Sequence, residues 1–283
     1  MSDEGRRATA RTVRVIRPAA DIVLRDEVVA VWRRLDLLYV FVRRELAVRY
    51  RQAVIGVLWV VLQPLITALI LTLVFSVFAR ISTGDLPYPV FALSGLVIWQ
   101  YFSRAVLEGT QSLVSNVALI SKVSFPRLIV PLTAPVAAGI DCLIVTGLLL
   151  AMTFGLGVAL KWTVILIPGV ILMSGLLAAG CALWLAPLNA IFRDIAVALP
   201  FVLQIAMYLS PVAYPADLVP ERIRWIYELS PIAVMVETAR WAIIGGKPPS
   251  AGGLVLFVAL TAALLLGGLK FFRRMEADLV DVI

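Results

Sequence analysis

Few side chains in this 283-residue sequence could carry out acid–base or nucleophilic chemistry. The chain contains no histidine, so its own residues cannot form a histidine-containing zinc site, a serine–histidine–aspartate triad or an imidazole proton shuttle. Cys142 and Cys181 both lie within apolar runs, which is typical of buried small residues and not of a disulfide framework. We therefore expect neither a catalytic site nor a metal site on this chain.

Asp141 is the ionisable residue whose position most needs an explanation, because it lies near the middle of a long apolar run. In a bilayer a charged group there costs at least roughly 2.5–3.5 kcal/mol unless it is paired or hydrated. A hydrogen-bonded structural aspartate and a proton-relay residue both stay open. We expect Asp141 to be isolated from other intramembrane charges, which favours the structural role. Glu108 follows Arg104 by four residues, which predicts an ion pair on one helix face without further function.

Nucleotide chemistry is also absent from the sequence. The phosphate-binding motif G-x-x-x-x-G-K-[ST] does not occur, and the most similar stretch, residues 245–248 (GGKP), lacks the first glycine spacing and the hydroxyl residue. No nucleophile–base pair is visible either. We therefore predict that the chain is not an enzyme and that any ATP used with it binds a separate subunit.

The composition points to a membrane as the solvent of this chain. Hydrophobic residues make up 61% of it and charged residues 15%, against roughly 45–50% apolar usage in soluble domains, and the mean hydropathy is +0.98. Apolar runs near 20 residues recur, and a helix of that length crosses a hydrocarbon core about 30 Å thick. We predict an all-α integral membrane protein with six spans, at residues 54–79, 89–107, 128–154, 162–187, 195–214 and 254–271.

Positive charge orients these spans. Of the 25 Lys and Arg residues, 19 belong to the two termini and to the connections that follow the second and fourth spans, when Arg104 and Lys270 at the ends of their spans are counted with them. Because flanking Lys and Arg stay in the cytoplasm, both termini are predicted to be cytoplasmic.

Residues 1–53 are predicted to form a cytoplasmic tail and an amphipathic interface helix that precede the span domain, residues 54–283. Apolar residues recur there at steps of three and four, with arginines between them. Such a helix can lie on the anionic inner leaflet and can also dock a cytoplasmic partner. The expected apolar face consists of Trp32, Leu35, Tyr39, Val42 and Leu46.

Two connections stand out between the spans. Residues 116–127 (NVALISKVSFPR) join the second and third spans on the cytoplasmic side, where Phe125-Pro126 restrains the backbone. The outer connection, residues 215–250, is long and rich in proline. A helical apolar face within it predicts two short helices, at 218–228 and 232–244, that dip into the outer membrane boundary.

Four stretches in this order resemble the permease subunits of ATP-binding-cassette transporters that export O-antigen, capsule and teichoic-acid polysaccharides. They are RYRQAVIGVLWVVLQPL (49–65), ALISKVSFPRLIVP (118–131), IFRDIAVALPFVLQIAMYLSPVAYP (191–215) and the terminal FFRRMEADLVDVI (271–283). No single stretch is diagnostic, but their joint order is specific. The resemblance covers residues 32–283 and leaves an N-terminal extension of about 25 residues without a role.

The resemblance implies a division of labour along the chain. It implies a homodimer with two separate ATPases that carry ATP and magnesium, a coupling segment at 116–127 and an outer gate between spans five and six. The residues implied to dock the ATPase are Arg43, Arg44, Ser121, Lys122, Pro126, Arg127, Arg193 and Asp194. Those implied for the gate are Glu221, Arg224, Glu237 and Arg240, of which Glu237 and Arg240, one helical turn apart, are expected to pair.

Aromatic residues in or beside the spans are candidates for a sugar path. Their flat faces pack on the C–H faces of sugars, and a Tyr hydroxyl or Trp N–H stays available for hydrogen bonds. The alternative is that each anchors a span end at the interface. The candidates are Trp59, Trp99, Tyr101, Trp184, Tyr208 and Tyr214.

The expected function is export of a lipid-linked polysaccharide from the cytoplasm across a bacterial inner membrane, with membrane lipids as surroundings and no nucleic-acid partner. Two alternatives stay open. A drug or lipid exporter of the same superfamily would have a narrower path with fewer aromatic residues. A proton-coupled carrier would need no ATPase, and Asp141 would then be indispensable.

Overall fold

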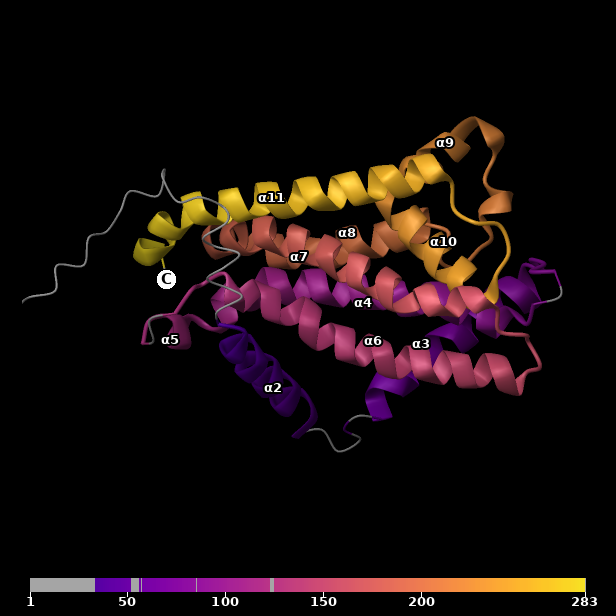
Figure 1. Cartoon of the computed structure of the whole chain (residues 1–283), viewed down its shortest axis with the longest axis horizontal. Coiled ribbons are helices and arrows are strands. Elements are labelled where there is room, and N and C mark those ends of the chain that lie inside the picture. The colour runs from indigo at the N-terminus through magenta and orange to yellow at the C-terminus, as the bar shows by residue number, and fades with distance from the viewer. Residues whose placement is uncertain (1–33, 52–55, 57, 85, 123–124, 283) are drawn as a thin grey trace, which may run out of the picture.

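The computed structural model describes residues 34–51, 56, 58–84, 86–122 and 125–282, with side chains up to Glu276. This part of the chain consists of helices and connections and contains no strand (Figure 1). The helices are α2 (Leu35–Arg51), α3 (Leu58–Leu71), the π-helix η1 (Thr72–Phe78), α4 (Tyr88–Ser115), α5 (Val117–Ile120), α6 (Ile129–Gly155), the short η2 (Trp162–Leu166), α7 (Ile167–Ile191), α8 (Asp194–Leu209), η3 (Ala216–Leu218), α9 (Glu221–Leu229), α10 (Pro231–Ile244) and α11 (Ala251–Val282).

Five helical segments of the described chain are long and apolar enough to cross a membrane, at Leu58–Phe78, Tyr88–Ser115, Ile129–Gly155, Trp162–Ile191 and Ala251–Glu276. They confirm five of the six predicted spans as helices of sufficient length. The remaining segment, α8, is apolar but has 16 residues. At 1.5 Å per residue it is about 24 Å long, less than a hydrocarbon core of about 30 Å, so the fifth predicted span, residues 195–214, stays a prediction.

The end predicted for the fifth span, residue 214, lies beyond helix α8. Helix α8 stops at Leu209, and Ser210 is extended, with φ −100° and ψ 152°. Pro211 follows, and the ring of a proline disfavours the helical conformation of the residue before it. The helix therefore ends five residues earlier than hydropathy alone suggests.

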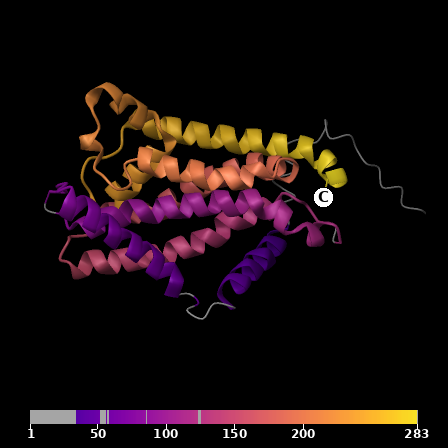
Figure 2. The same cartoon turned by 180° about the vertical axis from the view of Figure 1, so that it is seen from behind.

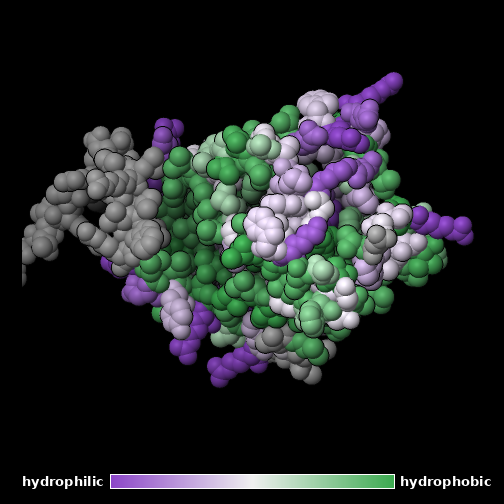
Figure 3. All heavy atoms as spheres, turned by 45° about the vertical axis from the view of Figure 1, so that its right-hand side comes forward, coloured by the Kyte–Doolittle hydropathy of each residue, from purple (hydrophilic) through white to green (hydrophobic). Residues whose placement is uncertain are grey.

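Helix α4 is the centre of the bundle. It packs on α3, α6, α7, α8 and α10, while α11 lies along α7. Small residues allow these close approaches, as is usual in membrane helix packing. A Cβ atom added to Gly109 of α4 would lie 2.6 Å from the Cβ of Ala182 on α7. Around this core the long flanks are apolar, and polar residues gather toward the ends (Figure 3).

Helix α2 lies against α6, outside the bundle, and diverges from α3 (Figures 1 and 2). Contact of its predicted apolar face with the membrane stays a prediction. Val42 is buried, but Tyr39 is 66% exposed and Leu35 is exposed as well, and Trp32 lies outside the described residues. The inward side instead carries Arg49, whose charged contacts with α4 and α6 set the rotation of the helix.

The outer connection contains the two predicted helices, now α9 and α10. Ser230 caps α10 by accepting a hydrogen bond from the Ala233 amide at 3.4 Å, and Pro231 occupies the first helical position. No residue of α9 is buried, whereas α10 buries most of one face against α4. The two helices therefore differ in how firmly the rest of the protein holds them.

Candidate functional site

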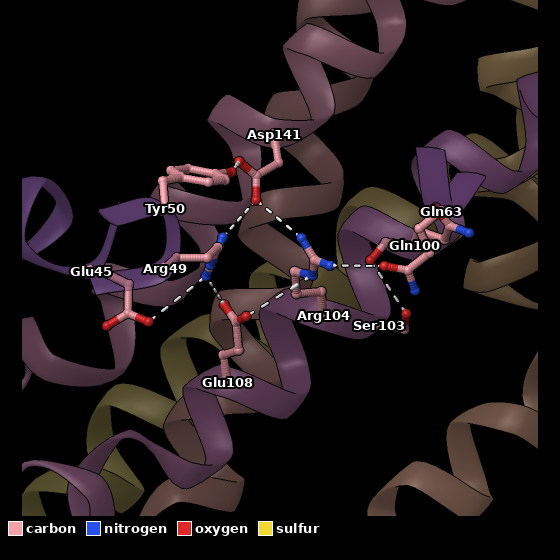
Figure 4. A network of polar contacts seen from close by, with 9 residues as sticks. All are labelled: Glu45, Arg49, Tyr50, Gln63, Gln100, Ser103, Arg104, Glu108 and Asp141. Carbon is pink, nitrogen blue, oxygen red and sulfur yellow. Dashed lines mark hydrogen bonds and ion pairs between the residues drawn. The ribbon is translucent and has the colours of Figure 1, made fainter. Parts of the chain in front are cut away.

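Asp141 of α6 is the centre of an ionic network between three helices (Figure 4). Its side chain is 6% exposed. The Oδ2 atom accepts hydrogen bonds from Arg49 Nη1 of α2 at 2.5 Å and from Arg104 Nη1 of α4 at 3.1 Å. The Tyr50 hydroxyl donates to Oδ1. Three donors from two helices thus meet on one carboxylate.

Glu108 of α4 completes this network. Its Oε2 atom lies 2.7 Å from Arg49 Nη2, and its Oε1 atom lies 4.0 Å from Arg104 Nε, which confirms the predicted i,i+4 pair. Glu45 contributes a weaker contact, at 3.8 Å from Arg49. Two arginines are shared by the buried Asp141 and the half-buried Glu108, so the central charges balance. We call Arg49, Tyr50, Arg104, Glu108 and Asp141 the inner network.

The expectation that Asp141 is isolated was therefore wrong. Arg49 lies 92 positions away in sequence, on a helix expected to lie at the interface, so no local pattern connects the two. The contact between Asp141 and Arg104, in contrast, could have been predicted from the sequence. Arg104 is 16 residues from Tyr88 at the start of α4, and Asp141 is 14 residues from Gly155 at the end of α6, which is about 24 Å and 21 Å respectively. Similar depth on two neighbouring spans would have indicated the pair.

A cleft of about 390 Å³ opens beside the network, between α3, α4, α6 and α8. Arg104 lies in its wall and reaches Gln63 of α3, with Nη2 at 3.5 Å from Oε1. We call this space the polar cleft, since amide, hydroxyl and charged side chains line it in the middle of an apolar bundle. Its polar lining residues are Gln63, Gln100, Ser103, Arg104, Glu108, Asp141 and Gln204.

The residues expected to dock the ATPase lie at one end of the bundle, where α5 and the end of α11 lie (Figure 1). Arg44 Nη1 donates to Asn116 Oδ1 at 3.4 Å, and the Phe41 and Phe125 rings are 5.2 Å apart, so α2 contacts the segment 116–127 directly. Arg127 Nη1 donates to the Glu276 carbonyl oxygen of α11 at 3.2 Å. Pro126 is half-buried, and the remaining members are exposed: Arg43, Ser121, Lys122, Arg193 and Asp194.

The six candidate aromatic residues do not share one surface. Tyr101 donates to the Pro135 carbonyl oxygen at 3.1 Å, and Trp99 is buried beside it on α4, although both reach the wall of the polar cleft. Trp184 belongs to the α7–α11 contact, where its Nε1 donates to the Leu264 carbonyl oxygen at 3.0 Å. Trp59 and Tyr208 are 51% and 58% exposed.

Tyr214 lies in the connection after α8, and its hydroxyl is 2.9 Å from that of Tyr227 on α9. Burial, together with this hydrogen bond, raises the pKa of Tyr214, so the hydroxyl stays protonated. This contact ties α9 to the end of α8.

The outer residues form a second buried charge cluster. Arg240 of α10 pairs with Glu237 at 2.6 Å, as predicted, and it also donates to the Val212 carbonyl oxygen at 2.9 Å. Its guanidinium lies 3.9 Å from the centre of the Phe91 ring of α4, a cation–π geometry. We call these four groups the outer cluster. Of the other two gate candidates, Glu221 is exposed and Arg224 donates to the Val219 carbonyl oxygen at 3.4 Å.

Comparison with known families places the chain. The profile of the ABC-2 type transporter family matches residues 36–244. The chain belongs to this family. It is 30% identical to an O-antigen export system permease protein RfbA of Klebsiella pneumoniae, over 88% of this chain and 95% of that protein. It is 26% identical to RfbA of Myxococcus xanthus, over 87% and 95%, and 24% identical to the polysialic acid transport protein KpsM of Escherichia coli, over 82% and 91%.

In this ABC-2 subunit the matched region runs from α2 to the end of α10. It therefore includes every member of the inner network, the polar cleft, the segment 116–127 and the outer cluster. Helix α11 lies beyond the matched region, but it closes the bundle by packing on α7.

Proposed function

We propose that this chain is the membrane-spanning permease of an ATP-driven exporter that moves lipid-linked polysaccharide from the cytoplasm across a bacterial inner membrane. The observation that carries the proposal is the ABC-2 match together with relatives named for O-antigen and polysialic acid export over more than four-fifths of the chain. The permease works as a homodimer with two ATPase subunits, which hold ATP and magnesium, and it makes and breaks no covalent bond itself. Both termini are cytoplasmic.

The contacts of α2 support a mechanical connection between the ATPase and the membrane path. Near its middle α2 touches the segment 116–127 through Phe41 and Arg44, and at its end it is joined to α4 and α6 through Arg49. A displacement of the docking surface is therefore transmitted to the wall of the polar cleft. Lys122 and Arg193 are exposed at the same end and supply charge for an acidic ATPase surface.

A proton-coupled carrier is the second class of function, and the inner network weighs against it. A carboxylate that carries protons must exchange its partners during each cycle. Asp141 is instead held by two guanidinium groups and a phenol. Breaking such a buried set leaves uncompensated charges, at a cost of about 3–5 kcal/mol. The arrangement favours a structural joint.

Co-purification from native membranes tests the proposal. We expect a stoichiometric ATPase to accompany the chain and to hydrolyse ATP. Lys122→Glu should weaken this association, because it reverses an exposed charge on the docking surface. Lys247→Glu, an equal change at the 86%-exposed Lys247 near the outer helices, is the matched control and should leave the complex intact. Purification without any nucleotide-binding subunit, together with proton-dependent transport by the chain alone, would overturn the proposal.

A further inference from the structure

The polar cleft has a composition that an apolar membrane bundle does not need for its own stability. Three of its lining residues are glutamines, one from each of three helices: Gln63 on α3, Gln100 on α4 and Gln204 on α8. Gln63 and Gln204 are exposed and Gln100 is half-buried, so their amides are not consumed by packing. Each amide offers two N–H donors and a carbonyl acceptor. Polar groups directed into a lipid-embedded space are costly unless something hydrogen-bonds to them.

The charge of the cleft restricts what can fill it. Arg104 is the cation in its lining, and it is engaged with Asp141 at 3.1 Å and with Glu108 at 4.0 Å. Arg49, behind the wall, balances the remaining carboxylate charge. No guanidinium among these has surplus charge for a phosphate or a carboxylate. An anion entering the cleft would lose its water without gaining a free cation, which is unfavourable in a low-dielectric site.

The rest of the lining suits the less polar faces of a ligand. Val60, Pro64, Leu203 and Met207 provide apolar surface, and the rings of Trp99 and Tyr101 reach the wall. Sugars combine hydroxyl groups, which both donate and accept, with C–H faces that pack on such surfaces. The volume of about 390 Å³ is at the lower end of ligand pockets, about 300–1,000 Å³, and so fits a short piece of a chain.

We infer that the polar cleft binds an uncharged, hydroxyl-rich stretch of the glycan, with Gln63, Gln100 and Gln204 as its hydrogen-bonding residues. The inference rests on the proposed function, because it places part of the exported polymer in this permease. It also names the class of cargo that contacts the cleft: neutral sugars, as opposed to carboxylated or phosphorylated ones. A lipid chain would offer no hydrogen bonds to the three amides.

Protection of a single thiol tests this inference. Gln204→Cys is introduced with Cys142→Ala and Cys181→Ala into the full chain, purified in nanodiscs with any accompanying subunits, and its maleimide modification rate is measured. A neutral dextran oligosaccharide at about twice its Kd should slow the reaction about threefold, since only the empty site reacts. A carboxymethylated dextran of equal length should not. Lys247→Cys in the same background is the control thiol outside the cleft, and neither probe should slow it.

A charge variant sharpens the result. Glu108→Gln leaves the two arginines with one carboxylate fewer, so the carboxymethylated probe should now protect the Gln204→Cys thiol, while continued protection by the neutral probe shows that the cleft is intact. Protection by neither probe in the parent background would overturn the inference, and so would protection by the anionic probe there. An ATPase that co-purifies without protection refutes the cleft assignment alone. Protection without any ATPase refutes the proposed function alone.

Discussion

The inner network and the outer cluster both bury arginine in an apolar bundle, but they are built differently. In the inner network, two arginines share two carboxylates across α2, α4 and α6, and the polar cleft opens beside them. In the outer cluster, Arg240 takes a carboxylate from its own helix, a carbonyl and a ring, and it is 5% exposed. The first joins a peripheral helix to the bundle, whereas the second fastens α10 to α4. Removing the first should therefore disturb coupling, and removing the second the outer end alone.

The largest effect is expected from Asp141→Leu. The substitution removes the buried acceptor of three donors and leaves two half-buried arginines with Glu108, and breaking a buried pair costs up to about 3–5 kcal/mol. We expect a marked fall in apparent Tm, measured by fluorescence-detected unfolding in nanodiscs. Glu45→Gln is the matched control, because its contact is 3.8 Å long and its side chain is 45% exposed. Equal Tm values for the two variants would show that the inner network does not hold α2.

A smaller loss is expected from Arg240→Met. Glu237, at 31% exposed, can turn to water when its partner is gone, so the main cost is the Val212 carbonyl left without a donor, about 1–3 kcal/mol. Apparent Tm should fall less than for Asp141→Leu, and ATP hydrolysis by the complex should be retained. If Arg240→Met destabilised the protein more than Asp141→Leu, the ranking of the two sites would be reversed. Export unchanged by Glu237→Gln with Arg240→Gln would remove the gate role from this pair.

The two sites also differ in how far the sequence predicts them. The Glu237–Arg240 and Arg104–Glu108 pairs follow from spacings of three and four on a helix, and the five long spans follow from hydropathy, so local rules suffice. The contact between Arg49 and Asp141 depends on how α2 packs on α6. The sequence of neither segment alone predicts this contact. The same cause explains why Arg49 was not expected on the inward side of α2: its partners lie on other helices.

The polar cleft was not predicted for a related reason. Its three glutamines are spread over residues 63–204 and have no common spacing. Trp99 and Tyr101 were predicted as channel residues from their type, and the structure places them in the cleft wall and largely in helix packing. Residue type pointed to Trp99 and Tyr101, but which other side chains share a surface with them can be seen only once the helices are packed.

The link from the docking surface to the inner network can be weakened without touching either charge site. Phe125→Leu removes the ring that contacts Phe41 at 5.2 Å, and such an aromatic pair is worth about 0.5–1.5 kcal/mol. We expect a small change in apparent Tm but fewer glycans exported per ATP hydrolysed, measured in proteoliposomes that contain the full complex. Phe154→Leu, at a 78%-exposed position at the far end of α6, is the control and should leave that ratio unchanged. A normal ratio in Phe125→Leu would exclude the Phe41–Phe125 contact as the route of coupling.

The smallest effect is expected from the exposed pair between Lys247 and Asp217. Its Nζ–Oδ1 distance, 3.1 Å, equals that between Arg104 and Asp141, but the side chains are 86% and 72% exposed. Water and salt screen such a pair, so Lys247→Ala should change the free energy of unfolding by about 0–1 kcal/mol at most. The apparent Tm of the variant should match that of the parent protein, and added salt should not produce a difference between the two. Because the two contacts are equally long, a large loss here would show that burial is not what separates the inner network from an ordinary surface ion pair.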